Sequence, residues 1–230
     1  YILLHLHHHL HFFHQKHIAA PPYYTSEGAD QHGLAVWGHF ASRDGVRWAQ
    51  LPAAIWNGLE VLNLTRINQT RVTRYDTDSI YTGSSTLVPG LAPDGASPGV
   101  LMVYPGLCRR QDWPRCHHGT LLAAAVPADY ATDPLLRRWR KPDYNPIAED
   151  SASISIGRDP STAWVTALGE YRFRTFDGVV FGAADAAAVR SGRWYRIGLN
   201  PSFPVGECPS VYPLPPPTPG TEATYRRLQA

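Results

Sequence analysis

The chain has 230 residues, a length that suits one large domain or two small ones. Charged residues make up only 17% of it and the net charge is +2, so no dense basic surface for a nucleic-acid backbone is expected. No stretch approaches the roughly 20 apolar residues of a membrane span. The composition therefore predicts neither a nucleic-acid partner nor a membrane segment.

The first expected element is a strand over residues 2–12, in which apolar residues alternate with histidines. Its opening lacks the basic start of a signal peptide, and a chain that begins inside a strand favours truncation. Residues two apart share one face, so the histidines have the spacing to chelate a divalent metal, although a merely polar strand face explains them too. No carboxylate lies nearby in sequence to support such ligands, and we expect no metal site. The histidines are His5, His7, His9 and His11.

Short apolar segments separated by turn signals follow along the whole chain, and no long 3.6-residue period predicts an extended helix. With 19 Gly, 21 Pro, 12 Tyr and 7 Trp, the chain is expected to be all-β, either a propeller or a sandwich. Residues 56–74 are polar and predict a surface loop. Residues 213–221 are too proline-rich for a central strand. The other expected strands are 34–42, 80–87, 99–104, 120–126, 163–167, 171–176, 179–183 and 194–199.

Cysteines and glycosylation sequences bear on the compartment. Cys108 and Cys116 flank one polar loop and can bridge, whereas Cys208 stands apart. Asn63 and Asn68 each begin an Asn-X-Thr acceptor triplet, and two such triplets in one polar loop favour a secretory route.

Two short segments pair a carboxylate with a rigid turn. Arg158 and Asp159 precede Pro160, which keeps the preceding residue extended. Glu207 stands beside Cys208 and Pro209, and a glutamate in apolar surroundings has a raised pKa and can act as a general acid. Taken singly, each segment is more often structural: an extended Arg-Asp pair, and an exposed loop glutamate.

Aromatic residues beside small polar ones precede these segments. They occur at Trp37-Gly38-His39, at Tyr75-Asp76, and at Tyr81 before Thr82-Gly83-Ser84. Sugar sites use this mixture, since sugar C–H faces lie on rings while carboxylates and hydroxyls bind the alcohols. A core aromatic beside a turn explains each one equally well.

Together and in this order, the motifs resemble the blocks of glycoside hydrolase family 32, which contains invertases, fructan hydrolases and fructosyltransferases. The resemblance covers nearly the whole chain to Pro213. It implies a five-bladed β-propeller, here partial, truncated at both ends and lacking the family's C-terminal β-sandwich. About three blades of four-stranded sheets are expected, the first of them without its innermost strand. Residues 1–213 would form the propeller domain and residues 214–230 a proline-rich tail. The blocks are Phe12-Phe13-His14-Gln15, Trp37-Gly38-His39, Ser42-Arg43-Asp44, Tyr75-Asp76, Tyr81-Thr82-Gly83-Ser84, Gly157-Arg158-Asp159-Pro160 and Glu207-Cys208-Pro209.

The resemblance also implies roles. Glu207 would be the general acid/base, Asp159 the transition-state stabiliser, and Arg158 the residue that orients both carboxylates. Gln15, Trp37 and Ser84 would line the sugar pocket, and Cys208 would tune the acid beside it. The implied activity is hydrolysis or transfer of fructosyl units of sucrose or fructans by a retaining mechanism, with no cofactor, in an extracellular or vacuolar setting.

One departure bears on activity. The family's nucleophilic aspartate lies in an Asn-Asp-Pro-Asn-Gly block before the strand that ends at Gln15, yet no aspartate occurs before Asp30. A retaining glycosidase needs two carboxyl groups, so these 230 residues by themselves are expected to be inactive. A non-catalytic carbohydrate-binding propeller fragment is the alternative function. An unstable truncated product with no function is a third interpretation.

Overall fold

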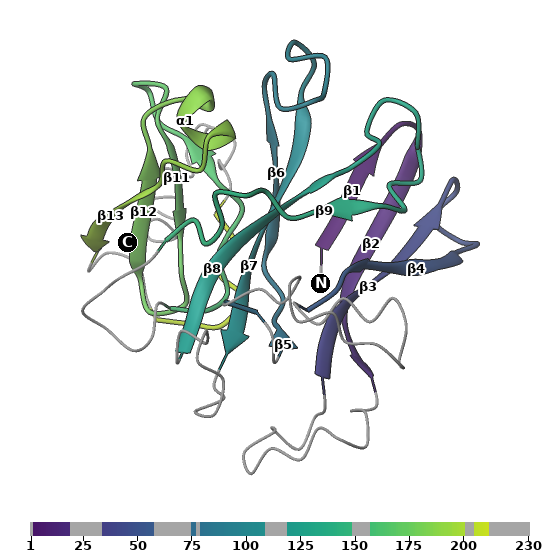
Figure 1. The fold of residues 1–230 in the computed structure, drawn as a ribbon, viewed down its shortest axis with the longest axis horizontal. Coiled ribbons are helices and arrows are strands. Elements are labelled where there is room, and N and C mark those ends of the chain that lie inside the picture. Colours follow the sequence, from purple (N-terminus) through teal and green to yellow (C-terminus); the bar gives the residue numbers. More distant parts are fainter. Residues whose placement is uncertain are drawn as a thin grey trace, which may run out of the picture.

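The computed structural model describes residues 2–18, 34–57, 75–76, 79–108, 119–148, 157–200 and 205–211. Within these ranges the chain is almost entirely strand, arranged in three antiparallel sheets that stand side by side (Figure 1). The predicted all-β class is confirmed. Asn63, Asn68, Cys116 and the tail 214–230 lie outside the described residues.

The first sheet is built in chain order from β1 (Ile2–Leu6), β2 (His9–Ile18), β3 (Leu34–Ser42) and β4 (Ala49–Ile55). Phe13 pairs with His39 and Gln15 with Trp37, so the predicted motifs of β2 and β3 lie opposite each other. Because directly opposed residues of antiparallel strands share a face, Gln15 and Trp37 are on the same side of this sheet.

The strand predicted over residues 2–12 is wrong. It is a hairpin with a two-residue turn at His7 and His8, whose φ angles are 51° and 60°. A two-residue turn with two positive φ values matches the right-handed twist of the flanking strands. Such turns usually contain Asn-Gly, so the sequence His7-His8 did not predict one. The four histidines therefore do not share one face: His5 is exposed, whereas His9 and His11 point inward. The first sheet consequently has four strands, rather than lacking its innermost one as a single long strand would require.

The middle sheet contains β5 (Ser79–Ile80), β6 (Ser84–Val88), β7 (Gly99–Cys108), β8 (Gly119–Pro127) and β9 (Trp139–Arg140). Every residue of β7 is buried, because both faces of this strand are covered by protein. A strand in that position needs an almost continuous apolar run rather than alternation, as in its residues 100–104.

The third sheet repeats the order of the first, with β10 (Trp164–Val165), β11 (Tyr171–Arg174), β12 (Val179–Ala183) and β13 (Tyr195–Leu199). A five-residue helix, α1 (Ala186–Arg190), is capped by Asp185, whose carboxylate accepts a hydrogen bond from the Ala188 N–H. None of the described residues forms a helix with the length and apolar character that a membrane crossing requires.

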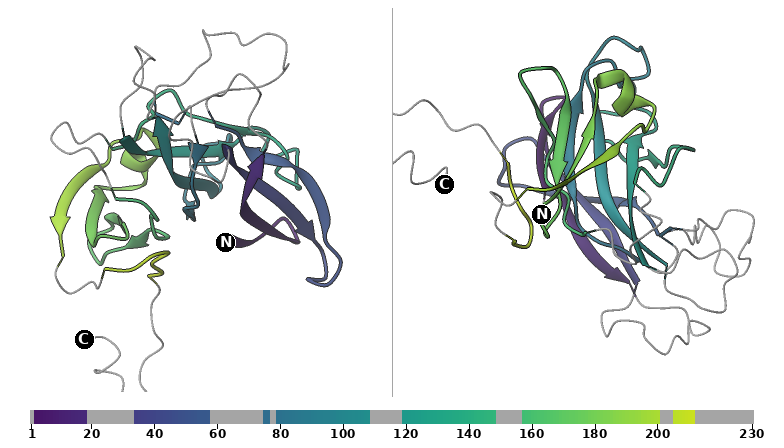
Figure 2. Two further views of the ribbon diagram at one scale, coloured as in Figure 1. Left: turned by 90° about the horizontal axis from the view of Figure 1, so that it is seen from below. Right: turned by 90° about the vertical axis from the view of Figure 1, so that its left-hand side faces the viewer.

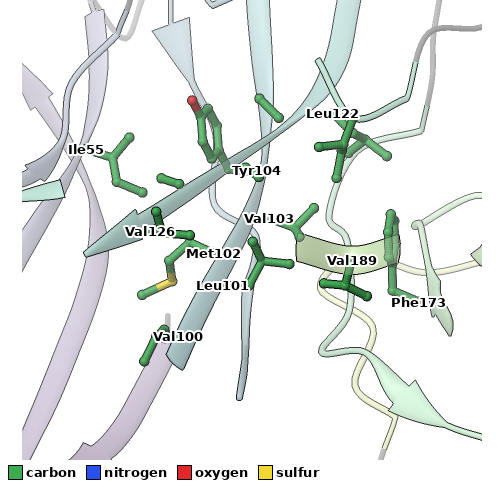
Figure 3. Close-up of a cluster of buried hydrophobic side chains, with 14 of the residues drawn as sticks. Ile55, Val100, Leu101, Met102, Val103, Tyr104, Leu122, Val126, Phe173 and Val189 are labelled. Carbon is green, nitrogen blue, oxygen red and sulfur yellow. The ribbon is translucent and has the colours of Figure 1, made fainter. Parts of the chain in front are cut away.

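The three sheets form an arc, and in the first and third the chain starts at the inner strand and steps outward (Figure 2). Their packed faces share one apolar core, in which Ile55, Met102, Tyr104 and Leu122 lie between the sheets (Figure 3). The third sheet joins this core through Phe173, which is fully buried. This arrangement is a partial β-propeller, as predicted.

The predictions for the 56–74 loop and for the cysteines fall only partly within the described residues. The surface loop predicted for 56–74 is described at its first two residues, where Trp56 is exposed but Asn57 is buried. Cys108 is disulfide-bonded and Cys208 is free.

A buried histidine pair lies on the inward face of the first sheet. His11 Nδ1 is 3.1 Å from His39 Nε2, and both rings are essentially inaccessible to solvent. Burial lowers the pKa of His11 to about 4 and that of His39 to about 3, against the opposing effects of a backbone hydrogen bond at Leu6 on His11 and of Asp133 on both. Both histidines are therefore neutral in the folded protein at neutral pH. No group of three or more His, Cys, Asp or Glu in the described part of the chain is arranged to hold a metal.

This pair predicts acid sensitivity. Below the unfolded-state pKa of about 6.5 the unfolded chain binds protons that the folded chain does not, so stability falls as pH falls, down to the folded pKa values. Each histidine adds about 1.4 kcal/mol per pH unit to the loss. Urea unfolding from pH 7 to 5 gives the slope of the free energy of unfolding against pH. In His39→Phe this slope should correspond to about one proton fewer than in the unmutated chain, and in the exposed control His5→Gln it should be unchanged. Equal slopes in all three proteins would contradict the burial argument.

Candidate active site

The Arg158-Asp159 and Glu207-Cys208 segments meet in space although 49 residues separate them. Residues 157–160 lead into β10, and residues 205–211 follow β13 and return to the inner side of the arc (Figure 2). An Arg158 guanidinium N–H donates to Glu207 Oε1, and Arg158 Nε lies 3.8 Å from Asp159 Oδ2. One arginine thus faces both predicted catalytic carboxylates.

The backbone on both sides of this contact is left-handed. Asp159 has φ 55° and Cys208 has φ 50°, a region that costs a non-glycine residue roughly 1–2 kcal/mol. Aspartate is among the residues that tolerate it, because its short carboxylate accepts local hydrogen bonds. Here the Cys208 N–H donates to Asp159 Oδ2 at 3.1 Å. This hydrogen bond joins the two segments and offsets part of the cost of the left-handed backbone.

The two carboxylates sit in different environments. The Asp159 side chain is 10% exposed and the Glu207 side chain 71%. Glu207 therefore lies in the exposed loop position that the sequence favoured for this glutamate taken singly, not in apolar surroundings, and its carboxylate is paired with arginine. The hydrogen bond to Glu207, followed by the charge of Asp159, raises the pKa of Arg158. Such an exposed ion pair adds little to the free energy of unfolding, so its contribution is to orient the Arg158 and Glu207 side chains.

The aromatic motif is buried beside this cluster. Trp37 is only 1% exposed, and its indole N–H donates to the Tyr81 carbonyl at 2.8 Å. The charge of Tyr81 is also the last of the causes that raise the pKa of Arg158. Ser84, also buried, pairs with Val103 at the start of β6. A Cβ at Gly83 would come within 1.9 Å of the Val103 carbonyl oxygen, so glycine is required there.

Gln15 and Cys208 are the remaining predicted site residues, and both are at least partly exposed. The Gln15 amide lies 3.2 Å from His17 Nε2, at the partly exposed end of β2. Cys208 is an exposed residue whose thiol is desolvated on one side. This desolvation and the Asp159 carboxylate raise its pKa, so the thiol is held in its protonated form. A neutral thiol next to an acid acts by polarisability rather than by charge.

Tyr75 and Asp76 are not in the cluster. Asp76 is fully buried and accepts hydrogen bonds from Lys141 Nζ at 2.5 Å and from the Tyr104 hydroxyl at 2.9 Å. The Tyr104 ring stands edge-on to Trp37, with centroids 6.3 Å apart. Of the two alternatives left open for Tyr75 and Asp76, the structure agrees with the core aromatic beside a turn, because both residues belong to a buried polar network that contacts Trp37 through Tyr104.

The chemistry available at this site is proton transfer beside a fixed cation. Glu207 is exposed enough to meet a ligand, Asp159 is held by a backbone N–H, and Arg158 faces both. These groups can donate a proton to a leaving oxygen and accept hydrogen bonds from hydroxyl groups of a ligand.

Comparisons with known proteins identify the family. Residues 8–216 match the family described as Glycosyl hydrolases family 32 N-terminal domain. The acid beta-fructofuranosidase 2, vacuolar, of a Rosa hybrid cultivar is 31% identical over 168 residues, which are 70% of this chain and 20% of that protein. The beta-fructofuranosidase insoluble isoenzyme 7 of Oryza sativa subsp. indica is 29% identical, over 79% of this chain and 27% of that protein.

Solved structures support the fold. Fructan 1-exohydrolase IIa from Cichorium intybus superposes with a TM-score of 0.55 at 24% identity, over 86% of this chain and 30% of that one. Exo-inulinase from Aspergillus awamori gives a TM-score of 0.53 at 17% identity, over 85% of this chain and 36% of that one. The chain spans about a fifth to a third of the length of the curated relatives that it matches. Since the family match extends over residues 8–216, this chain belongs to glycosyl hydrolase family 32.

Proposed function

We propose that this chain carries the acid/base and stabiliser half of a β-fructofuranosidase site, which hydrolyses or transfers fructosyl units of sucrose or fructans with retention of configuration. The observation that supports this most is the convergence of Asp159 and Glu207 on Arg158. In this proposal Glu207 protonates the glycosidic oxygen and later activates water. Asp159 accepts hydrogen bonds from fructosyl hydroxyls.

Gln15, Trp37 and Ser84 are proposed to line the sugar pocket. Trp37 and Ser84 are buried, so their part is to shape the wall of the pocket, whereas Gln15 is accessible to a ligand. Cys208 is proposed to tune the neighbouring acid. The names of the relatives, one vacuolar and another a cell wall isozyme, support a vacuolar or extracellular location.

Product analysis tests the proposed function. A chain extended at its N-terminus by the Asn-Asp-Pro-Asn-Gly block should release fructose from sucrose, and proton NMR of the first product should show the β-anomer. Maltose, which has no fructosyl unit, is the control substrate and should not be cleaved. Maltose cleavage or an inverted anomer would contradict the proposal. Sucrose binding without turnover by the extended chain would replace it with the carbohydrate-binding alternative.

A further inference from the structure

Phe176 lies where the two candidate catalytic segments meet. It sits in the turn from Thr175 to Gly178 between β11 and β12, in which the Gly178 N–H donates to the Thr175 carbonyl at 3.0 Å. Gly178 has a φ of 84°, and the Thr175 hydroxyl donates to Asp177 Oδ1 at 2.6 Å. The turn is thus fixed by its own hydrogen bonds before it contacts either segment.

The peptide groups of Phe176 bind both segments. Its N–H donates to the Arg158 carbonyl at 2.9 Å, and its own carbonyl accepts the Gly206 N–H at 3.0 Å. Arg158 precedes Asp159 and Gly206 precedes Glu207, so one residue tethers the backbone next to each carboxylate. The rigid turn therefore sets how far apart the two segments stand.

The ring of Phe176 holds the arginine. The Arg158 guanidinium carbon lies 4.5 Å from the ring centroid, a contact in which the planar cation is attracted to the negative face of the ring. Phe176 is only half-buried and is absent from the apolar core, which Phe173 and Phe181 fill. Filling the core is therefore not its main contribution.

We propose that Phe176 is a positioning residue of the fructosyl site. Its backbone spaces the two carboxylate-bearing segments, and its ring restrains the Arg158 side chain so that the guanidinium faces Glu207 and Asp159. The consequence for catalysis rests on the proposed function, but the restraint on Arg158 does not. An arginine with 43% of its side chain exposed and no such ring would sample many rotamers and hold the carboxylates loosely.

NMR of the arginine side chains in the 230-residue chain tests the restraint without any turnover. The Arg158 Nε–H signal, assigned through Arg158→Lys, should be displaced by the ring current of Phe176 and should show low mobility. In Phe176→Leu it should shift toward the free-arginine position and become mobile, and Phe176→Tyr should restore it. Phe40→Leu, a half-buried phenylalanine in the first sheet, is the matched control and should leave it unchanged.

Replacement of Phe176 by pentafluorophenylalanine covers the case in which Phe176→Leu does not fold. This ring keeps a similar size but loses its negative face, so Arg158 should again become mobile while the core amide signals stay unchanged. An Arg158 signal that stays displaced and rigid in both variants would overturn the proposal.

Kinetics of the chain extended by the upstream block provide the functional readout. Phe176→Leu should lower kcat for fructose release roughly 10- to 100-fold while KM changes little. The alkaline limb of its pH–rate profile should move to higher pH, because the pKa of the proposed acid Glu207 rises when the nearby Arg158 cation is less well held. Unchanged kcat and pH limb would overturn the catalytic part. An inactive extended wild-type chain would count against the proposed function, while the NMR result still decides on the restraint.

Discussion

Replacing Asp76 by alanine is expected to lower the free energy of unfolding by about 3–5 kcal/mol, because it leaves a largely buried lysine without its counter-charge. Asp76 is fully buried, and Lys141 has only 21% of its side chain exposed. The Tyr104 hydroxyl would lose this acceptor as well and keep only its side-chain hydrogen bond with Tyr75. Urea unfolding of the 230-residue chain at neutral pH measures the loss.

Asp129→Ala is the matched control, because its ion pair with Arg138 is exposed, and the expected loss is below about 1 kcal/mol. Removing both charges at once, in Asp76→Leu with Lys141→Met, should recover much of the stability lost in Asp76→Ala. If Asp76→Ala cost no more than Asp129→Ala, the buried network would not exist in solution.

The largest expected effect on activity is that of Glu207→Gln. In the chain extended by the upstream block, fructose release from sucrose should fall about 10²- to 10⁴-fold, because the amide cannot protonate the leaving oxygen. An aryl fructoside, whose leaving group departs without a proton, should lose much less. This difference between substrates is what identifies an acid rather than a structural residue.

Glu170→Gln controls for the loss of a glutamate paired with an arginine in the same sheet. Its carboxylate accepts from Arg172 at 2.6 Å and from the Tyr195 hydroxyl at 3.1 Å, away from the candidate site. Its rate should match that of the unmutated chain. An equal loss with both substrates in Glu207→Gln would assign Glu207 to structure rather than to proton transfer.

Much of the fold followed from local patterns. Strands were predicted at 99–104, 171–176 and 179–183, and the structure has strands at Gly99–Cys108, Tyr171–Arg174 and Val179–Ala183. The turn at His7 and His8 could not be predicted, because its residues rarely adopt two positive φ values. The sequence therefore predicted a single strand over residues 2–12, where the first sheet has the two strands β1 and β2.

The candidate site was predicted through its motifs, not through its contacts. Arg158, Asp159 and Glu207 were found because their blocks resemble a known family, whereas their approach across 49 residues is visible only in the structure. The partner of Asp76 is likewise 65 residues away, at Lys141, so the pair gave no local signal. Phe176 was missed because a phenylalanine at the end of an apolar strand has no pattern that separates an arginine platform from a core residue.

The most direct test of the central claim compares the 230-residue chain with the version extended by the Asn-Asp-Pro-Asn-Gly block. Asp159 and Glu207 can stabilise and protonate, but neither is proposed to attack the anomeric carbon, and losing one member of such a unit costs several powers of ten in rate. Fructose release from sucrose should therefore be negligible for the 230 residues and restored in the extended chain. Robust release by the 230-residue chain, abolished by Glu207→Gln, would show that the nucleophile lies within these residues and contradict the account.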